Sequence, residues 1–389
     1  MIRIVHISDL HISEHILRGA NAHSKLPHRY GHDLPTFLDL DRFLRESDWD
    51  LLLITGDVSR IGNKESFESV RNWIENELVF GATRVGLNLS KSDSRHYVIV
   101  PGNHDRFNGA LVQNSLTNYT QEFGAVAPGD VKTIKIKNET INLHLFDSSA
   151  NNWSFAYGTI DQRCMIKKNL RDDHIDLALL HHHFLQPPKH PREISTELTN
   201  SAQVASYMLN TGFDGIFFGH THKGYIGRPS VEILSGLLND RRKIPRFWTR
   251  MFPKYFLRKK DQDGLVSYER ESAKNGQLPT LSTYFDYLYL RQKGHDLASP
   301  ASFNSIRGFY DQMKAVATAG TMAQELEAAK KKQILISLAP SACQAEAEWN
   351  GFHVIEVSRN SDNAIEIDWN RYEFKNGGFS LKPHDEHVS

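Results

Sequence analysis

Five short apolar runs, each followed directly by polar residues, set the pattern of the first 222 residues. Runs of this length that end at turn-forming residues predict strands buried on both faces of a sheet. The runs are Ile2–Ile7, Leu51–Ile54, Tyr97–Val100, Leu177–Leu180 and Ile216–Phe218.

Helical spacing fills the intervals between these runs. From Phe67 to Leu78 apolar residues recur three or four positions apart, and Ser201–Leu209 predicts a second helix that ends at Gly212. Strands that alternate with helices predict an α/β fold in which helices cover a sheet. Ligands of such sheets bind beyond the carboxyl ends of the strands, where all five polar clusters are expected to lie.

The character of the chain changes after His222. Residues 225–332 lack the rhythm of buried strands, and a helical pattern over Ser305–Lys332 closes this segment. Strand patterns return from residue 333 onward. We therefore expect a core over residues 1–224, a helical cap inserted at residues 225–332, and C-terminal strands over residues 333–389 that complete the core.

The C-terminal strand patterns include one irregularity. Apolar residues alternate from Ile365 to Trp369, and the phase then slips to Tyr372 and Phe374. A slip of this kind predicts a β-bulge.

Within the expected cap, the stretch Arg241–Lys260, called the basic-aromatic segment below, carries nine Lys or Arg residues, five aromatic residues and no acid. Its aromatic positions fit a cap helix that packs on the core. Contacts to a phosphate-rich substrate or nucleic acid, and attachment to an anionic membrane surface, are the other two interpretations. Pro245 and Pro253 argue against one continuous helix.

Composition narrows the class of protein. Over 389 residues, 46 Lys and Arg balance 46 Asp and Glu, which excludes a basic field over the whole protein. The two cysteines, Cys164 and Cys343, are too few for a disulfide framework. The sequence begins directly with a strand pattern and has no apolar stretch of the roughly 18 residues that a transmembrane segment needs. These features predict a cytoplasmic protein without a transmembrane segment.

The polar clusters contain carboxylate, amide and imidazole ligands. A carboxylate such as Asp57 has two oxygens and can bridge two cations. This mixture of oxygen and nitrogen ligands suits Mn, Fe, Zn or Ni better than Ca or Mg alone. Seven candidates are too many for one ion and suit two divalent metal ions. They are Asp9, His11, Asp57, Asn103, His182, His220 and His222.

The ordered motifs resemble those of the calcineurin-like metallophosphoesterase superfamily. They are Asp9-x-His11, Gly56-Asp57, Gly102-Asn103-His104-Asp105, His182 and Gly219-His220-Thr221-His222. The resemblance implies a four-layer αββα sandwich and a dinuclear-metal-dependent phosphoester hydrolase that uses a metal-bridging hydroxide. It implies one metal site made of Asp9, His11, Asp57 and His222, and another made of Asp57, Asn103, His182 and His220.

The same resemblance implies two catalytic residues. His104 would stabilise the transition state or protonate the leaving oxygen, and Asp105 would orient the His104 imidazole. From the residues alone, Asp105 could instead pair with Arg106 or cap a helix.

Phe146-Asp147-Ser148 and Tyr157–Gln162 are similar to a stretch of the cyclic-nucleotide phosphodiesterase branch. That branch reads His-His-Pro after the fourth strand, whereas this chain reads His181-His182-His183-Phe184. We take His182 as the metal ligand and keep His181 as the alternative. The resemblance favours a small phosphodiester, such as a cyclic nucleotide, as the substrate.

Two other functions remain open from the sequence. A nuclease similar to the double-strand-break repair nucleases would bind nucleic acid through the basic-aromatic segment. A binding module would use the cap and keep only a vestigial metal site.

Overall fold

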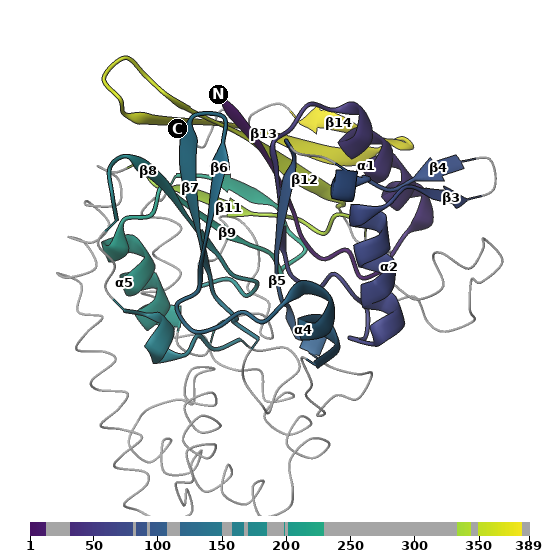
Figure 1. The fold of residues 1–389 in the computed structure, drawn as a ribbon, viewed down its shortest axis with the longest axis horizontal. Helices are drawn as coiled ribbons and strands as arrows, with labels where there is room; N and C mark the ends of the chain where they lie inside the picture. The colour runs from purple at the N-terminus through teal and green to yellow at the C-terminus, as the bar shows by residue number, and fades with distance from the viewer. Residues whose placement is uncertain are drawn as a thin grey trace, which may run out of the picture.

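Two mixed β-sheets pack face to face, and helices cover their outer sides (Figure 1). The computed structural model describes residues 1–12, 32–80, 83–91, 94–106, 117–149, 158–166, 170–184, 198, 201–228, 333–343 and 349–382.

The first sheet has the strand order β14-β13-β12-β1-β2-β5. Its strands β1, β2 and β5 run parallel, and its other neighbouring pairs are antiparallel. The strands are β1 (Ile2–Ile7), β2 (Leu51–Thr55), β5 (His96–Val100), β12 (Gly351–Arg359), β13 (Ile365–Lys375) and β14 (Gly378–Lys382).

The second sheet has the strand order β10-β11-β9-β8-β7-β6. Its four inner strands run parallel, and β6 and β10 are antiparallel strands at the two edges. The strands are β6 (Val131–Ile136), β7 (Glu139–Leu145), β8 (His174–Leu179), β9 (Gly215–Phe218), β10 (Tyr225–Gly227) and β11 (Leu335–Leu338). A separate hairpin joins β3 (Leu78–Phe80) and β4 (Thr83–Val85).

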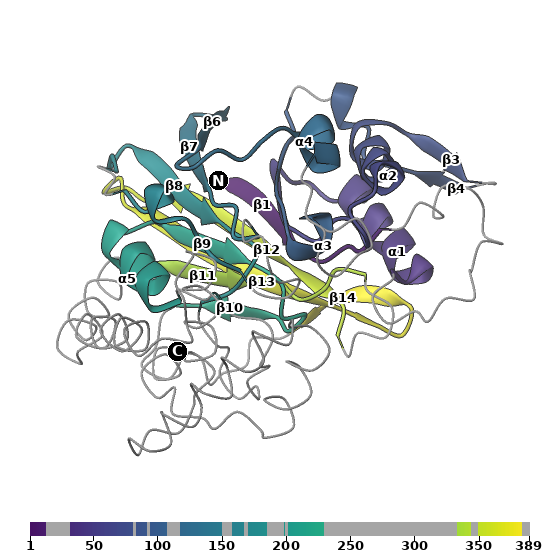
Figure 2. The same ribbon diagram turned by 90° about the horizontal axis from the view of Figure 1, so that it is seen from below.

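Helices α1 and α2 flank the first sheet and α5 flanks the second (Figure 2). Three apolar clusters match the layers: one between the first sheet and its helices, one between the sheets, and one between the second sheet and α5. This order of layers confirms the predicted αββα sandwich. The helices are α1 (Leu34–Glu46), α2 (Lys64–Glu75), α3 (Asn103–Arg106), α4 (Thr117–Phe123) and α5 (Ser201–Thr211), with short 3-10 turns η2 (Leu89–Lys91) and η3 (Gln162–Cys164).

The two helices expected from apolar spacing are present. The α2 helix begins after Asn63, whose side chain accepts a hydrogen bond from the Ser66 N–H. It ends at Glu75, so Leu78 belongs to β3 rather than to the helix. The α5 helix ends just before Gly212, whose φ of 74° is the left-handed conformation that glycine adopts readily.

The predicted bulge in the C-terminal strand is wrong. Residues Ile365–Glu373 pair one to one with β12 without an extra residue. Ile365, Ile367 and Trp369 pack against the cluster between the sheets. Tyr372 packs instead on the opposite face, against the cluster beneath α1. The apolar phase slips because the buried face of the strand changes along its length, while the pairing register continues.

Strands from both ends of the chain share these sheets. The β12 strand pairs with β1, and β11 pairs with β9. The β10 strand begins at Tyr225, where the sequence suggested that the core gives way to a cap, and it pairs with β11 in the second sheet. The rest of the expected cap, including the basic-aromatic segment, lies outside the described residues. Within the described part of the chain, no helix has both the length and the apolar character to span a membrane.

Candidate metal centre

The polar clusters follow the carboxyl ends of parallel strands from both sheets. Parallel strands direct their following loops toward one edge, which brings distant residues together. Asp9 and His11 follow β1, Asp57 follows β2, Asn103 and His104 open α3 after β5, His181 follows β8, and His220 and His222 follow β9.

Five of the predicted ligands have a left-handed backbone, with φ between 48° and 73°. A positive φ is uncommon outside glycine and persists only where the surrounding structure holds it. It turns the chain sharply at the strand end and aims the side chain inward. The five residues are Asp9, His11, Asp57, His220 and His222.

Two glycines let these loops approach one another closely. Gly56 has a φ of 90°, and a Cβ there would lie 2.5 Å from Nδ1 of His181. A Cβ at Gly102 would overlap the backbone and carboxylate of Asp57. Both positions therefore require glycine because a ligand occupies the space of its missing side chain.

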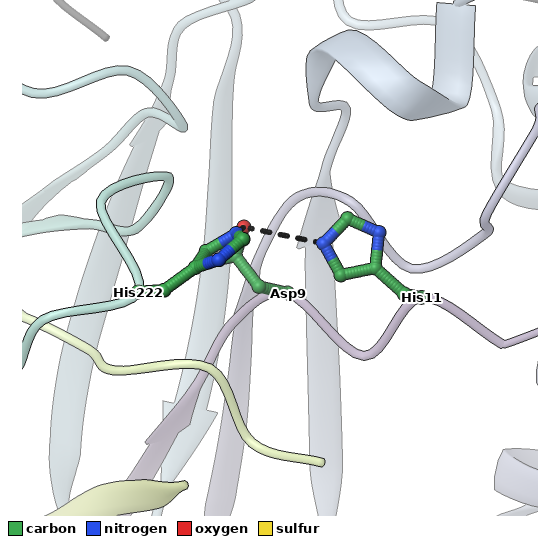
Figure 3. A group of neighbouring side chains, drawn as sticks. All are labelled: Asp9, His11 and His222. Atoms are coloured by element: carbon green, nitrogen blue, oxygen red, sulfur yellow. Dashed lines mark ion pairs between the residues drawn. The ribbon is translucent and has the colours of Figure 1, made fainter. Parts of the chain in front are cut away.

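The structure brings the candidate ligands into three overlapping groups, within each of which the ligand atoms lie within 4.8 Å of one another. Asp57 belongs to two of the groups and His11 to two. Figure 3 shows the first group, with the Asp9 carboxylate between the rings of His11 and His222. The groups are Asp9, His11 and His222; His11, Asp57 and His104; and Asp57, His181 and His220.

Distances within the first part of the site leave space between the ligands for an ion. Nε2 of His222 lies 3.2 Å from Oδ1 of Asp9. Nε2 of His11 lies 3.9 Å both from that oxygen and from Oδ2 of Asp57. The His11 ring is fully buried, and neither of its nitrogens has a hydrogen-bond partner.

The second part of the site is tighter. Nε2 of His181 lies 3.1 Å from Oδ1 of Asn103, 3.0 Å from Nδ1 of His220 and 3.4 Å from Oδ2 of Asp57. Nδ1 of His181 donates a hydrogen bond to the Thr55 carbonyl oxygen. The lone pair of a neutral His181 therefore faces two oxygens, an arrangement that requires a proton or a metal ion between them.

Burial and charge separate the histidines into two kinds. Burial lowers the pKa of His11 to about 3 and holds the pKa of His220 well below its usual value. Burial also opposes the charged form of His181, but the Asp57 carboxylate outweighs it and raises the pKa of His181 to about 9. Asp9 raises the pKa of His222 in the same way.

Both carboxylates stay ionised despite their burial. Burial would raise the pKa of Asp9, yet His222 beside it brings the pKa well below the usual value. His181 and His104 lower the pKa of Asp57 likewise. The buried carboxylates lie beside imidazole nitrogens, and Asp9 Oδ1, His11 Nδ1 and His11 Nε2 are buried without a hydrogen-bond partner. This donor set fits divalent cations.

His104 lies beside this donor set. Its Nδ1 donates a hydrogen bond of 2.8 Å to the Arg60 carbonyl oxygen, which can only accept, so Nδ1 carries the proton. Nε2 then lies 4.0 Å from Oδ2 of Asp57. Burial lowers the pKa of His104, so the ring is neutral at pH 7 with a lone pair on Nε2.

The role of Asp105 differs from the predicted one. The Arg60 carbonyl, rather than Asp105, orients the His104 imidazole. The Asp105 carboxylate accepts hydrogen bonds from the backbone N–H groups of Ser59, Gly102 and Val58, at 2.9, 2.9 and 3.3 Å. Asp105 thus ties the loop after β5 to the loop after β2. Arg106 pairs with Asp147, at 2.7 Å.

The preference for His182 as the metal ligand is corrected in the same way. His181, and not His182, joins Asp57 and His220 in the ligand group. Nδ1 of His182 lies 3.0 Å from the Ser148 hydroxyl oxygen. The centroid of the His182 ring lies 4.4 Å from that of His220, but His182 belongs to none of the three ligand groups.

Two supporting residues escaped the sequence analysis as parts of the site. The Ser148 hydroxyl oxygen accepts the backbone N–H groups of both His181 and His182, at 3.1 and 3.0 Å. Arg60 contributes only its carbonyl oxygen to His104. Ser148 lies in the stretch that resembles the phosphodiesterase branch, so the sequence offered a signal for it. The role of Arg60 could not be predicted, because every residue type has a backbone carbonyl.

The sandwich and its metal-ligand groups define the class of metal-dependent phosphoesterases. The sequence matches the family model of calcineurin-like phosphoesterases over residues 2–224, more than half of the chain, and the protein belongs to this family. No curated protein matches the sequence.

Several solved structures are similar to the chain. Vps29 from Chaetomium thermophilum is 8% identical over 98% of this chain and 94% of its own, with a TM-score of 0.33. The purple acid phosphatase PPD1 from yellow lupin is 12% identical over 59% of this chain and 39% of its own, with a TM-score of 0.33. A dimetal phosphatase from Danio rerio is 13% identical over 59% of this chain and 85% of its own, with a TM-score of 0.32.

Proposed function

We propose that the protein is a phosphodiesterase that depends on two divalent metal ions and hydrolyses a small phosphodiester such as a cyclic nucleotide. The observation that carries this proposal is the shared position of Asp57, which lies in two of the three ligand groups. A buried carboxylate between two sets of imidazole rings is suited to bridging two cations.

Asp9, His11, Asp57 and His222 would hold one ion, and Asp57, Asn103, His181 and His220 the other. Two ions held in this way polarise a phosphoryl group, supply a nucleophile near neutral pH and stabilise the leaving oxygen. The ligand set contains Asn and His beside Asp, which favours Mn, Fe, Zn or Ni.

His104 would act on the oxygens of the phosphoryl group. Because Nδ1 is committed to the Arg60 carbonyl, only Nε2 can face a substrate. A protonated Nε2 donates a hydrogen bond to a transition-state oxygen or transfers its proton to the leaving oxygen. The lowered pKa of His104 leaves the free ring neutral at pH 7, and a bound phosphoryl anion beside Nε2 would favour the protonated form.

The preference for a diester is supported by the resemblance of residues 146–162 to the cyclic-nucleotide phosphodiesterase branch. Described residues of this stretch pack beneath the ligand loop. Ser148 accepts the N–H of His181, and a Cβ on Gly158 would overlap the His182 ring. The two free cysteines support a reducing compartment, and we propose a cytoplasmic location.

The second candidate function is a nuclease, favoured by the nine cationic and five aromatic residues of the basic-aromatic segment. A direct comparison separates the two candidates. Protein stripped with a chelator and reloaded with Mn²⁺ is assayed on cyclic AMP and on single-stranded DNA. Turnover of cyclic AMP alone supports the small-substrate proposal, and cleavage of DNA alone supports the nuclease.

The substitution Asp57→Asn tests the metal mechanism itself. The amide of Asn offers one neutral oxygen in place of two anionic ones, so the bridge between the two ions is lost. We expect turnover to fall by about a thousandfold or more, and the bound metal measured by elemental analysis to fall with it. Exposed Asp172 provides the matched control, and Asp172→Asn should leave both quantities unchanged. Full metal-dependent turnover by Asp57→Asn would contradict the proposal.

A further inference from the structure

The ligand loop after β9 holds the side chain of Asp9. Its Oδ2 accepts a hydrogen bond of 3.0 Å from the His220 N–H, and its Oδ1 lies 3.2 Å from Nε2 of His222. Its φ of 55° is a conformation that persists only when its neighbours hold it. The direction of the carboxylate therefore depends on what fixes the backbone of residues 8–10.

The loop after β2 supplies part of that restraint, since the Gly56 and Asp57 carbonyl oxygens accept the N–H groups of Asp9 and His11 at 3.1 and 2.9 Å, and a segment more than 300 positions away supplies the rest. The Ser341 hydroxyl donates to the Asp9 carbonyl oxygen at 2.9 Å, and the Ala342 N–H donates to the Ser8 carbonyl oxygen at 2.9 Å. The Cys343 thiol donates to the Leu10 carbonyl oxygen at 3.3 Å. Three consecutive residues thus bind three consecutive carbonyl groups of the first ligand loop.

The segment that binds Asp9 is itself firmly placed. The Ser341 carbonyl accepts the N–H of Gly351, and the Cys343 carbonyl accepts the N–H of Asp33. Ser341, Ala342 and Cys343 are all fully buried, so water cannot replace their hydrogen bonds. Since Ala342 contributes only its backbone, its bond remains in any side-chain variant, and the hydroxyl and thiol are the parts that substitution can remove.

We propose that Ser341 and Cys343 are positioning residues of the metal centre. They fix the carbonyl groups on either side of the left-handed turn at Asp9, and so aim the Asp9 carboxylate at His11 and His222. The inference rests on the proposed function only in requiring that the site bind metal ions. It concerns one half of the site, because the side-chain bonds of both residues run to the loop after β1, which carries Asp9 and His11.

The test is a calorimetric titration of the chelator-treated full chain with Mn²⁺. The wild-type chain should bind two ions. Ser341→Ala should weaken one of the two by about tenfold and leave the other unchanged, since loss of a bond that orients a ligand costs metal affinity in this range. Cys343→Ala should weaken the same ion by a smaller factor, because a thiol is a weaker donor than a hydroxyl.

Matched controls separate positioning from general stability. Ser69 is buried in α2 and donates a hydrogen bond of 2.8 Å to the Glu65 carbonyl oxygen, and Cys164 is a second buried thiol. Ser69→Ala and Cys164→Ala each remove a buried hydroxyl or thiol that does not belong to a ligand loop, and the melting temperature of the metal-free chain is measured for all four variants. Both controls should bind Mn²⁺ as the wild type does.

A double-variant cycle identifies the half of the site that is affected. In a His222→Ala background, Ser341→Ala should cause little further loss of Mn²⁺ affinity, because both changes act through Asp9. In a His220→Ala background the tenfold loss should remain. Equal weakening of both ions, or unchanged affinity for both, would overturn the inference while leaving the proposed function intact. A wild-type chain that binds no Mn²⁺ would overturn both.

Discussion

His181 and His222 differ from the other ligand histidines in their protonation. Burial opposes the charge on both rings, but Asp57 raises the pKa of His181 to about 9 and Asp9 raises the pKa of His222. In the metal-free protein at pH 7, His181 carries a proton on the side where a metal ion would bind. For an unperturbed histidine, with a pKa of about 6.5, a proton would compete with the metal ion only below that pH.

Metal binding should therefore release protons at pH 7. The metal-free form of His181 is protonated below a pH of about 9, so we expect the affinity for Mn²⁺ to rise about tenfold per pH unit from pH 6 to 8 for this one proton. Calorimetry in buffers with different ionisation enthalpies measures the number of protons released. An affinity that does not change with pH over this interval would contradict the assignment.

The same charge pair affects the stability of the metal-free fold. His181 has a higher pKa in the folded chain than in the unfolded chain, so its protonation stabilises the fold. This contribution is complete below a pH of about 6.5 and is lost as the pH rises through about 9. Bound metal ions would neutralise the charges of Asp57 and Asp9 in the same pH range.

At the scale of elements, Asp105 joins two strand ends rather than acting on substrate. Its carboxylate accepts N–H groups from the loops after β2 and β5, which carry Asp57 and Asn103. Burial, reinforced by the nearby Asp57 charge, raises the pKa of Asp105 to about 7. The hydrogen bonds favour its ionised form.

Asp105→Asn should destabilise the junction between these loops. The substituted amide turns an N–H group toward backbone donors, and we expect the free energy of unfolding to fall by about 2 kcal/mol. Urea unfolding of the metal-free chain measures this change, and exposed Asp362→Asn is the control. Turnover should fall in parallel with metal affinity. A large loss of turnover with normal stability and metal binding would restore a catalytic role for Asp105.

At the scale of the whole molecule, the segment between residues 228 and 333 leaves and re-enters the second sheet at neighbouring points. The β10 and β11 strands pair antiparallel, with Gly227 opposite Ile336. Arg228 contacts the Gln333 carbonyl through its guanidinium group at 3.4 Å. Every residue of the three ligand groups lies before this segment.

Replacing residues 229–332 by a short Gly-Ser linker should preserve the sandwich. A linker of about four residues spans two antiparallel neighbours, so the sheet can close without strain. We expect cooperative unfolding and the binding of two Mn²⁺ ions by the shortened chain, measured by circular dichroism and calorimetry. Loss of either would show that the segment is part of the core rather than an insertion into it.

Several strands and helices could be predicted from the sequence, because the apolar pattern that produces them lies within the element itself. The Leu51–Ile54 run became β2, and the apolar spacing from Phe67 became α2, since burial on one or both faces imposes these periods. The change of buried face along β13 did not follow, because Trp369 packs between the sheets and Tyr372 packs beneath α1. The sequence of a strand does not show which layer of the fold will pack on each of its faces.

The sequence by itself determined the strand runs, the family motifs and the chemical types of the ligands, because these depend on local order and side-chain chemistry. Only the tertiary structure decided that His181 faces Asp57, that Asp105 binds backbone amides, and that Ser341 reaches the Asp9 carbonyl. Each of these outcomes depends on the direction of a side chain toward a loop that is distant in the chain. Packing of the two sheets sets that direction.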